Sequence, residues 1–172
     1  QVCPEGIEGL SGQTRKPVRL RGYDYSSGGT YFVTICSQDR KRIFWSEQPV
    51  GQGLCPCLSP AGLIVQEEIE ALPERFPSIL IDNYVVMDNH VHILLTITRQ
   101  GQSPCPTLGA VIGACKSITT KRINKMWNTL GCRLWQWRFH DHIIRDEADY
   151  LSRWTYIETN PARRREDKYC EE

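Results

Sequence analysis

The sequence predicts an α+β domain in which an antiparallel sheet carries helices, with one further helix near the C-terminus. Runs of β-branched and aromatic residues that are typical of strands alternate with segments whose apolar residues recur at helical spacing. The 172-residue chain is also 40% hydrophobic and 24% charged, which is the composition of an ordinary folded domain. We therefore expect a single domain over residues 1–172, with its core within residues 19–166.

The first strand is predicted over residues 30–36, where aromatic and β-branched residues follow the turn signal Ser27-Gly28-Gly29. The Cys- and Pro-containing residues 55–57 further on are expected to lie in a loop. A helix then starts at Ser59-Pro60, because Ser is a favoured N-cap and Pro is favoured at the first helical position. Pro73 ends this helix, and three apolar residues are expected to share one face: Leu63, Ile69 and Leu72.

Two strands are predicted in the middle of the chain, over residues 83–87 and 90–97. Asp88-Asn89 between them tolerates the left-handed conformations of a tight turn, so the two strands are expected to be antiparallel neighbours. A longer helix follows, because apolar residues recur at helical spacing in Leu108, Val111, Ile112, Cys115 and Ile118.

The last strand is predicted at residues 134–139, a short segment with two tryptophans, and the last helix at residues 149–160, where Pro161 stops it. The order of elements is then β-α-β-β-α-β followed by one helix. This is the order of a ferredoxin-like fold, in which helices pack on one face of an antiparallel sheet.

Charge and cysteine content exclude some classes of protein. A net charge of +1 argues against a protein coated with basic residues, although a local basic surface is compatible with it. Basic residues that are candidates for phosphate contacts gather in clusters that include Arg19 and Arg21, and Lys116, Lys121 and Arg122. The eight cysteines contain no CxxC pair, so reduced thiols in a cytoplasmic protein are expected. Because no long apolar run and no secretory signal are visible, neither membrane insertion nor export is expected.

The motif Asn89-His90-Val91-His92 carries the most informative side chains. On a strand, His90 and His92 point to one face while Val91 and Ile93 point to the other. Neutral imidazole is a common ligand of divalent metals, so two histidines on one face can bind one ion. The motif alone also fits a pair of ordinary buried or exposed histidines.

The predicted last helix supplies a phenol. At about 100° per residue, Leu151, Trp154 and Ile157 share one side of this helix and Tyr156 lies nearly opposite them. Asn160 is four residues later, so its side chain lies next to the phenol and can bind a metal or a substrate. A surface tyrosine beside a polar helix end is the alternative interpretation.

Two histidines and one tyrosine together suit phosphodiester chemistry. A phenol is a weak nucleophile at neutral pH, but a divalent cation can polarise the phosphate that it attacks. The Tyr156 oxygen would form a 5′-phosphotyrosine bond and release a 3′-hydroxyl that can reverse the reaction. No nucleotide cofactor is needed, because the bond energy is retained.

Seven segments, in order along most of the chain, resemble one known family. They are Gly22-Tyr23-Asp24-Tyr25, Tyr31-Phe32-Val33-Thr34, Met87-Asp88-Asn89-His90-Val91-His92, Lys116-Ser117, Lys121-Arg122-Ile123-Asn124, Asp141-His142-Ile143-Ile144-Arg145-Asp146-Glu147, and Tyr156-Ile157 with Asn160-Pro161-Ala162. Together they resemble the single-tyrosine HUH transposases, and among these the REP-associated tyrosine transposase branch.

This resemblance implies an enzyme that cuts and rejoins single-stranded DNA next to short hairpins, with Mg²⁺ or Mn²⁺ as cofactor. It implies that His90 and His92 are metal ligands, that Tyr156 is the nucleophile, and that Asn160 is a further ligand or phosphate contact. His142 and Arg145 lie in a motif shared within the branch and are expected to support the site or contact DNA. A monomer or a homodimer is expected, because the tyrosine helix can complete the site of its own subunit or of a partner.

Departures from the family pattern are Asp88, where relatives often have proline, and His140, where many have an aromatic residue. Two other functions remain compatible with the residues. A non-catalytic nucleic-acid-binding module would stack bases on Trp135, Trp137 or Phe139. A metal-dependent hydrolase would use an activated water in place of Tyr156.

Overall fold

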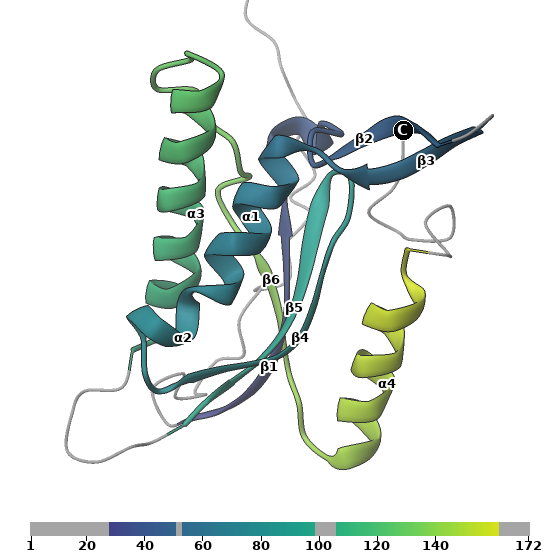
Figure 1. The fold of residues 1–172 in the computed structure, drawn as a ribbon. Coiled ribbons are helices and arrows are strands. Elements are labelled where there is room, and N and C mark those ends of the chain that lie inside the picture. Colours follow the sequence, from purple (N-terminus) through teal and green to yellow (C-terminus); the bar gives the residue numbers. More distant parts are fainter. Residues whose placement is uncertain (1–27, 51–52, 99–105, 162–172) are drawn as a thin grey trace, which may run out of the picture.

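A four-stranded antiparallel sheet lies at the centre of the fold, and helices cover both of its faces (Figure 1). The computed structural model describes residues 28–50, 53–98 and 106–161, with the backbone alone for residues 47–50 and 53–56. The strand order is β4 (Ile79–Val86), β5 (His90–Ile97), β1 (Gly29–Cys36) and β6 (His140–Ile143). This is the order of a ferredoxin-like sheet, so the predicted fold class is confirmed.

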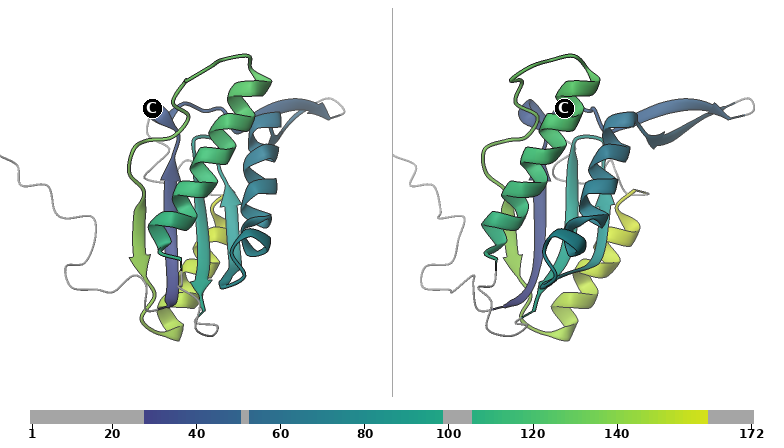
Figure 2. Two further views of the ribbon diagram at one scale, coloured as in Figure 1. Left: turned by 90° about the vertical axis from the view of Figure 1, so that its left-hand side faces the viewer. Right: turned by 60° about the vertical axis from the view of Figure 1, so that its left-hand side comes forward.

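Helices α1 (Pro60–Glu70) and α3 (Leu108–Met126) lie side by side on one face of the sheet, and α4 (Glu147–Thr159) covers the other face (Figure 2). The short helices are η1 (Gln38–Arg40) and α2 (Leu72–Arg75). A hairpin of β2 (Trp45–Val50) and β3 (Gly53–Leu58) projects beyond the sheet (Figure 1). In the described part of the chain, no helix has the length and apolar character needed to span a membrane.

Alternate side chains of each central strand enter two separate apolar clusters. On β5, Ile93 belongs to the large cluster beneath α1 and α3, whereas its neighbour Leu94 belongs to the small cluster beneath α4. His90 and His92 have the parity of Leu94 along the strand. The predicted placement of both histidines on one face is therefore confirmed, and this face is the one that α4 covers.

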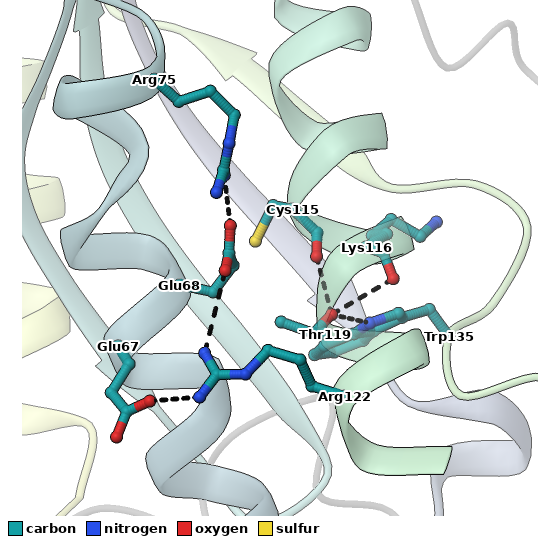
Figure 3. Close-up of polar contacts among 8 residues, drawn as sticks. All are labelled: Glu67, Glu68, Arg75, Cys115, Lys116, Thr119, Arg122 and Trp135. Carbon is teal, nitrogen blue, oxygen red and sulfur yellow. Dashed lines mark hydrogen bonds and ion pairs between the residues drawn. The ribbon is translucent and has the colours of Figure 1, made fainter. Parts of the chain in front are cut away.

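A buried carboxylate connects the helices on the opposite face (Figure 3). Glu68 of α1 is 3% exposed and forms an ion pair with Arg75 of α2 and a longer one, 3.9 Å, with Arg122 of α3. Arg122 also pairs with Glu67 at 2.5 Å. A carboxylate away from water is stable only with such partners. The two guanidinium groups therefore tie α1, α2 and α3 together around Glu68.

Local signals in the sequence explain where most elements begin. Each long helix starts at a side-chain N-cap: Ser59 Oγ accepts from the Gly62 N–H (3.1 Å), Thr107 Oγ1 from Ala110 (3.2 Å) and Asp146 Oδ1 from Asp149 (2.8 Å). The predicted helix start at Ser59-Pro60 is confirmed. Strand β5 has its predicted bounds, whereas β4 starts at Ile79, four residues before the predicted range.

The predicted strand at residues 134–139 is wrong. This segment forms a single bridge, between Trp135 and Ser37, and the strand that pairs with β1 is the following segment, β6. The carbonyl groups of Gln136 and Trp137 accept hydrogen bonds from the Lys116 ammonium instead, at 2.6 and 3.1 Å. A side chain from α3 therefore takes the place of a partner strand here.

Residues 55–57, which were expected to lie in a loop, belong to β3. The β2–β3 hairpin contains proline in both strands, with Pro49 opposite Leu54 and Pro56 opposite Glu47. Proline is tolerated because each strand of a two-stranded sheet has an outer edge that needs no ladder hydrogen bonds. Because proline is unusual within strands, the two prolines made this hairpin unrecognisable from the sequence.

Two helix faces also differ from their prediction. Leu63 is 48% exposed, and the buried face of the first helical segment contains Val65 with Ile69 and Leu72, at the spacing i, i+4 and i+7. On α3, Thr119 rather than Ile118 continues the buried stripe. The Thr119 hydroxyl fits there because it donates to the Cys115 carbonyl at 2.7 Å and accepts from the Trp135 indole at 2.9 Å (Figure 3).

Candidate functional site

His90 and His92 direct their ring nitrogens toward one point on the α4 side of the sheet. Both side chains are fully buried, and their Nε2 atoms lie 3.1 Å apart. Two nitrogens that bind one cation at about 2.1 Å, at a right angle, lie about 3.0 Å apart. The observed separation therefore suits two ligands of a single divalent metal ion.

Neighbouring side chains orient both imidazole rings. His90 Nδ1 donates to Asn89 Oδ1 at 2.6 Å, which leaves the Nε2 lone pair available for a cation. His92 Nδ1 lies 2.9 Å from Thr34 Oγ1 on the adjacent strand. When the Thr34 hydroxyl accepts this bond, both Nε2 lone pairs face each other, and such a pair is stable only with a proton or a cation between them. The donor set therefore fits a metal.

The backbone turn before His90 is supported by contacts on the α1 side of the sheet, opposite to α4. The carbonyl of Asp88 accepts from the N–H groups of Ile43 and Phe44, at 2.9 and 3.0 Å. Gly62 of α1 packs so closely on this segment that a Cβ atom there would lie 2.1 Å from the Phe44 carbonyl oxygen. Asp88 itself is buried and pairs with Arg42 at 3.5 Å. The charge that Asp88 brings to this turn is therefore balanced locally.

Tyr156 contacts this site from α4. Its ring centroid lies 5.2 Å from that of His92 and 5.9 Å from that of Phe32. The predicted placement of Tyr156 opposite the apolar stripe is wrong, because Tyr156 and the buried Ile157 both face the sheet, while Leu151 is 54% exposed. The side chains of α4 that pack in the small cluster are Tyr150, Trp154, Tyr156 and Ile157, so the predicted shared side of Trp154 and Ile157 is confirmed and only Leu151 and Tyr156 differ from the prediction.

Phe32 of β1 connects the histidine and the tyrosine. Its ring stacks on His92 with the centroids 5.1 Å apart and 21° between the planes. The Arg153 guanidinium lies over the same ring at 5.4 Å. One aromatic ring therefore contacts His92, Tyr156 and Arg153. Phe32 and Thr34 could not be identified from the sequence, because their roles follow from the register in which His92 lies opposite Thr34. The role of Arg153 likewise follows from the packing of α4 on Phe32.

Asn160 caps the C-terminal end of α4 and is buried. The next residue, Pro161, lines a cavity of about 520 Å³ together with Val85, which lies opposite His92 in the sheet. The end of α4 thus lies at the histidine end of the sheet. Within the described ranges, no cluster of three or more His, Cys, Asp or Glu residues could hold a metal ion. A further donor would have to be of another type, such as an amide oxygen.

His142 joins β6 to the first turns of α4. Its Nε2 lies 2.7 Å from Asp149 Oδ2, and Asp149 Oδ1 accepts from Arg153 Nε at 3.4 Å. Burial raises the pKa of the Asp149 carboxyl, but the hydrogen bond and charge of His142, with the charge of Arg153, lower that pKa below its ordinary value overall. His140 and His142 lie opposite Thr34 and Phe32. All four histidines of the chain therefore project from the α4 side of the sheet.

The predicted DNA-contacting residues do not all lie together. Lys116, Lys121 and Arg122 are on α3, and α3 covers the face of the sheet opposite to α4 (Figure 2). The Lys116 ammonium is half-buried against two backbone carbonyls, and this burial lowers its pKa. Arg145 is exposed just before α4, and Arg19 and Arg21 lie outside the described residues. The structure therefore brings His90, His92, Tyr156, Asn160 and His142 to one face and separates them from the α3 residues.

Sequence comparisons identify two relatives in Haemophilus influenzae, although no family model matches the chain. An uncharacterised protein is 31% identical over 164 residues, which cover 86% of this chain and 88% of the relative. A second protein, named "Putative REP-associated tyrosine transposase", is 23% identical over 148 residues, which cover 81% of this chain and 74% of that protein.

Two solved structures have a similar fold. A REP-associated tyrosine transposase bound to a REP hairpin has a TM-score of 0.55 at 22% identity, over 85% of this chain and 73% of that chain. A "putative transposase" from Deinococcus radiodurans R1 has a TM-score of 0.50 at 16% identity, over 82% of this chain and 95% of that chain. The chain therefore belongs to one family with the uncharacterised Haemophilus influenzae protein, and in sequence and fold it is similar to the REP-associated tyrosine transposases.

Proposed function

We propose that this protein is a metal-dependent transesterase that cuts and rejoins single-stranded DNA next to hairpins, with Tyr156 as its nucleophile. The observation that carries this proposal is the contact of Tyr156 with His92, whose Nε2 lies 3.1 Å from that of His90. The REP hairpin bound by the structurally similar transposase supports hairpin DNA as the substrate. Transposase-like relatives support strand transfer rather than degradation of DNA.

The chemical step is an exchange of one phosphodiester for another. The Tyr156 oxygen loses its proton to solvent and attacks the phosphorus, so a tyrosine–phosphorus bond forms. The bond from phosphorus to the 3′-oxygen breaks, and that oxygen takes up a proton. The DNA 5′-phosphate is then linked to the protein, and a 3′-hydroxyl can reverse the step. No external energy source is required.

His90, His92 and Asn160 would hold the Mg²⁺ or Mn²⁺ ion of this reaction. The ion would supply Lewis acidity toward the phosphate. Asn89 and Thr34 keep the two imidazoles in position, and Phe32 holds the Tyr156 ring against His92. Arg153, one turn before Tyr156, adds a positive charge on the same side of α4.

The site as proposed is complete within one chain. Tyr156 contacts the His92 of its own sheet, and only residues 144–146 connect β6 to α4. So short a connection limits how far α4 can move away from its own sheet. We therefore propose cleavage by a monomer, with a homodimer as the alternative that a measurement of mass would detect.

The test is covalent capture of labelled DNA. The full chain is incubated with single-stranded hairpin oligonucleotides and Mn²⁺ or Mg²⁺, and the products are separated on a denaturing gel. We expect a protein–DNA adduct that EDTA abolishes and that Tyr156→Phe lacks. Tyr150→Phe is the matched control, because Tyr150 is on the same helix and packs on the same cluster.

The other outcomes identify the competing functions. Cleavage without an adduct, retained in Tyr156→Phe, would indicate metal-dependent hydrolysis. Binding without cleavage across a broad panel of hairpins, with either metal, would indicate a non-catalytic DNA-binding protein. An adduct that persists in Tyr156→Phe would assign the nucleophile to another residue.

A further inference from the structure

A groove lies on the face of the molecule away from Tyr156, between α3 and the extended segment that leads to β6. Its volume is about 480 Å³. Gly109 and Gly113 form part of its α3 side, and Trp135 and Trp137 lie on its other side. Neither the histidines nor Tyr156 line this groove, so the proposed cleavage site does not explain it.

Trp137 is held firmly at its backbone but presents its ring to solvent. The carbonyl of Trp137 accepts from the Lys116 ammonium, and the preceding Gln136 N–H donates to the Cys36 carbonyl of β1 at 3.0 Å. Trp135, two residues earlier, is buried and donates from its indole to Thr119 (Figure 3). Even so, the Trp137 side chain is 81% exposed. A large aromatic ring that is exposed to water on a hydrogen-bonded backbone offers a surface for stacking.

The charged residues in the described lining of the groove are all basic. Lys121 and Arg133 line it, and no acidic residue is among its described lining residues. The Arg133 guanidinium lies 5.9 Å from the centre of the Trp137 ring. An exposed aromatic ring beside two cations is the combination by which proteins hold unpaired bases and their phosphates.

We propose that this groove binds an unpaired base of single-stranded DNA, stacked on Trp137, with the neighbouring phosphates on Lys121 and Arg133. In duplex DNA the neighbouring base pairs cover both faces of each base, so a duplex offers no base for stacking on Trp137. The inference takes single-stranded DNA as ligand from the proposed function, but it requires neither cleavage nor metal.

The position of the groove gives the bound strand a route to the candidate active site. Trp137 lies three residues before β6, the edge strand of the sheet, and His142 of β6 is already on the Tyr156 side. A strand held at Trp137 therefore passes around the β6 edge to reach α4. The groove would anchor DNA flanking the hairpin while Tyr156 acts on the far side.

Trp137→Ala in the full chain tests the proposal by fluorescence anisotropy with a labelled oligothymidine in EDTA. Loss of one stacked base is expected to weaken binding about tenfold. The matched control is Trp127→Ala, because Trp127 is 43% exposed at the end of α3 and does not line the groove. Unchanged affinity in Trp137→Ala, or an equal loss in both variants, would overturn the proposal.

Gly113 offers a second test that keeps Trp137. A Cβ atom at Gly113 meets no atom within 4 Å, so larger side chains fit there without disturbing the fold. Gly113→Glu adds a carboxylate to the groove and is expected to weaken binding, whereas Gly113→Ala is expected to bind like the original chain. Equal affinities of these two variants would contradict the proposal.

The result of the binding test can be distinguished from the result of the cleavage test of the proposed function. Tyr156→Phe is expected to abolish the adduct and to keep full affinity for oligothymidine, so binding can fail or succeed without cleavage. Reduced binding in Trp137→Ala supports the groove even if no adduct forms in any condition. If Trp137→Ala instead abolishes a concentration-dependent dimer and leaves DNA affinity unchanged, the groove receives a second copy of the chain and the proposal is wrong.

Discussion

The two faces of the central sheet differ in what they bury. Beneath α1 and α3 lies a large apolar cluster, and its buried carboxylate, Glu68, has two guanidinium partners. Beneath α4, the small apolar cluster of the described residues has three buried members, Phe32, Leu94 and Ile157, and two buried imidazoles lie beside it. The first face supplies most of the apolar burial that stabilises the domain. The second face can therefore carry polar groups whose burial would be costly without such support.

The largest expected effect on stability comes from truncating one buried isoleucine to alanine on each face of the sheet. Ile93→Ala leaves a cavity within the large cluster and is expected to lower the free energy of unfolding by about 4 kcal/mol. Ile157→Ala affects the small cluster, where α4 can settle closer to the sheet, and is expected to cost about 2 kcal/mol. Denaturant unfolding measures both. Equal losses would show that the two faces contribute alike to stability.

The ion pairs of Glu68 allow the stabilising face to be altered without touching α4. Arg75→Met leaves the Glu68 carboxylate with Arg122 at 3.9 Å and is expected to cost about 2 kcal/mol. Glu67→Gln is the control, because Glu67 is exposed and its pair with Arg122 contributes less than about 0.5 kcal/mol. The adduct assay, well below the unfolding temperature, should be unchanged in both. Loss of the adduct in Arg75→Met would show that the faces are coupled.

Thr34→Val alters the α4 face with little effect on the fold. Without the hydroxyl, His92 Nδ1 loses its partner, and affinity for Mn²⁺ is expected to fall about tenfold. Thr30→Val is the matched control, because Thr30 is on the same strand and bonds Thr96 instead. Isothermal titration with Mn²⁺ provides the affinities. If both variants bind alike, Thr34 does not orient a metal ligand.

The smallest expected effect concerns the pH dependence of α4 docking. The pKa of Asp149 is lowered in the folded chain, so its contribution to stability is present above the ordinary carboxyl pKa and is lost as the pH falls through the lowered value. Asp149→Asn is expected to cost less than about 1 kcal/mol at pH 7, and this difference should begin to shrink near about pH 4 and disappear only below the lowered pKa. Unfolding at a series of pH values measures it, with Glu158→Gln as control. A difference that grows with acidity would contradict the assignment.

A feature of the fold or the site could be predicted from the sequence where its signal lies in neighbouring residues of the chain. Period-two alternation in β5 was enough to put His90 and His92 on one face, and N-cap chemistry was enough to begin α1 at Ser59-Pro60. Thr34 and Phe32 were not identifiable, because their contacts depend on the register between β1 and β5. Such cross-strand pairing is set by the whole sheet and leaves no signal near either residue.

Two further errors have the same origin in tertiary contacts. Tyr156 was expected away from the apolar side of α4, but an amphipathic tyrosine also packs when an aromatic surface such as Phe32 is available. Residues 134–139 have the composition of a strand, yet Lys116 binds the carbonyl groups that a strand would need. In both places, a contact with a side chain distant in the sequence determines the structure more strongly than the local preference of the residues.

The close contact between Gly62 and Phe44 has a consequence for random mutagenesis. The Phe44 and Ile43 amides support the Asp88 carbonyl, two residues before His90, and any side chain at Gly62 would collide with the Phe44 carbonyl. A genetic screen for inactive proteins should therefore return Gly62 substitutions alongside those at His90 and Tyr156. Second-site suppressors of these changes should arise in residues 42–45, and suppressors of Tyr156→Phe should not arise at all.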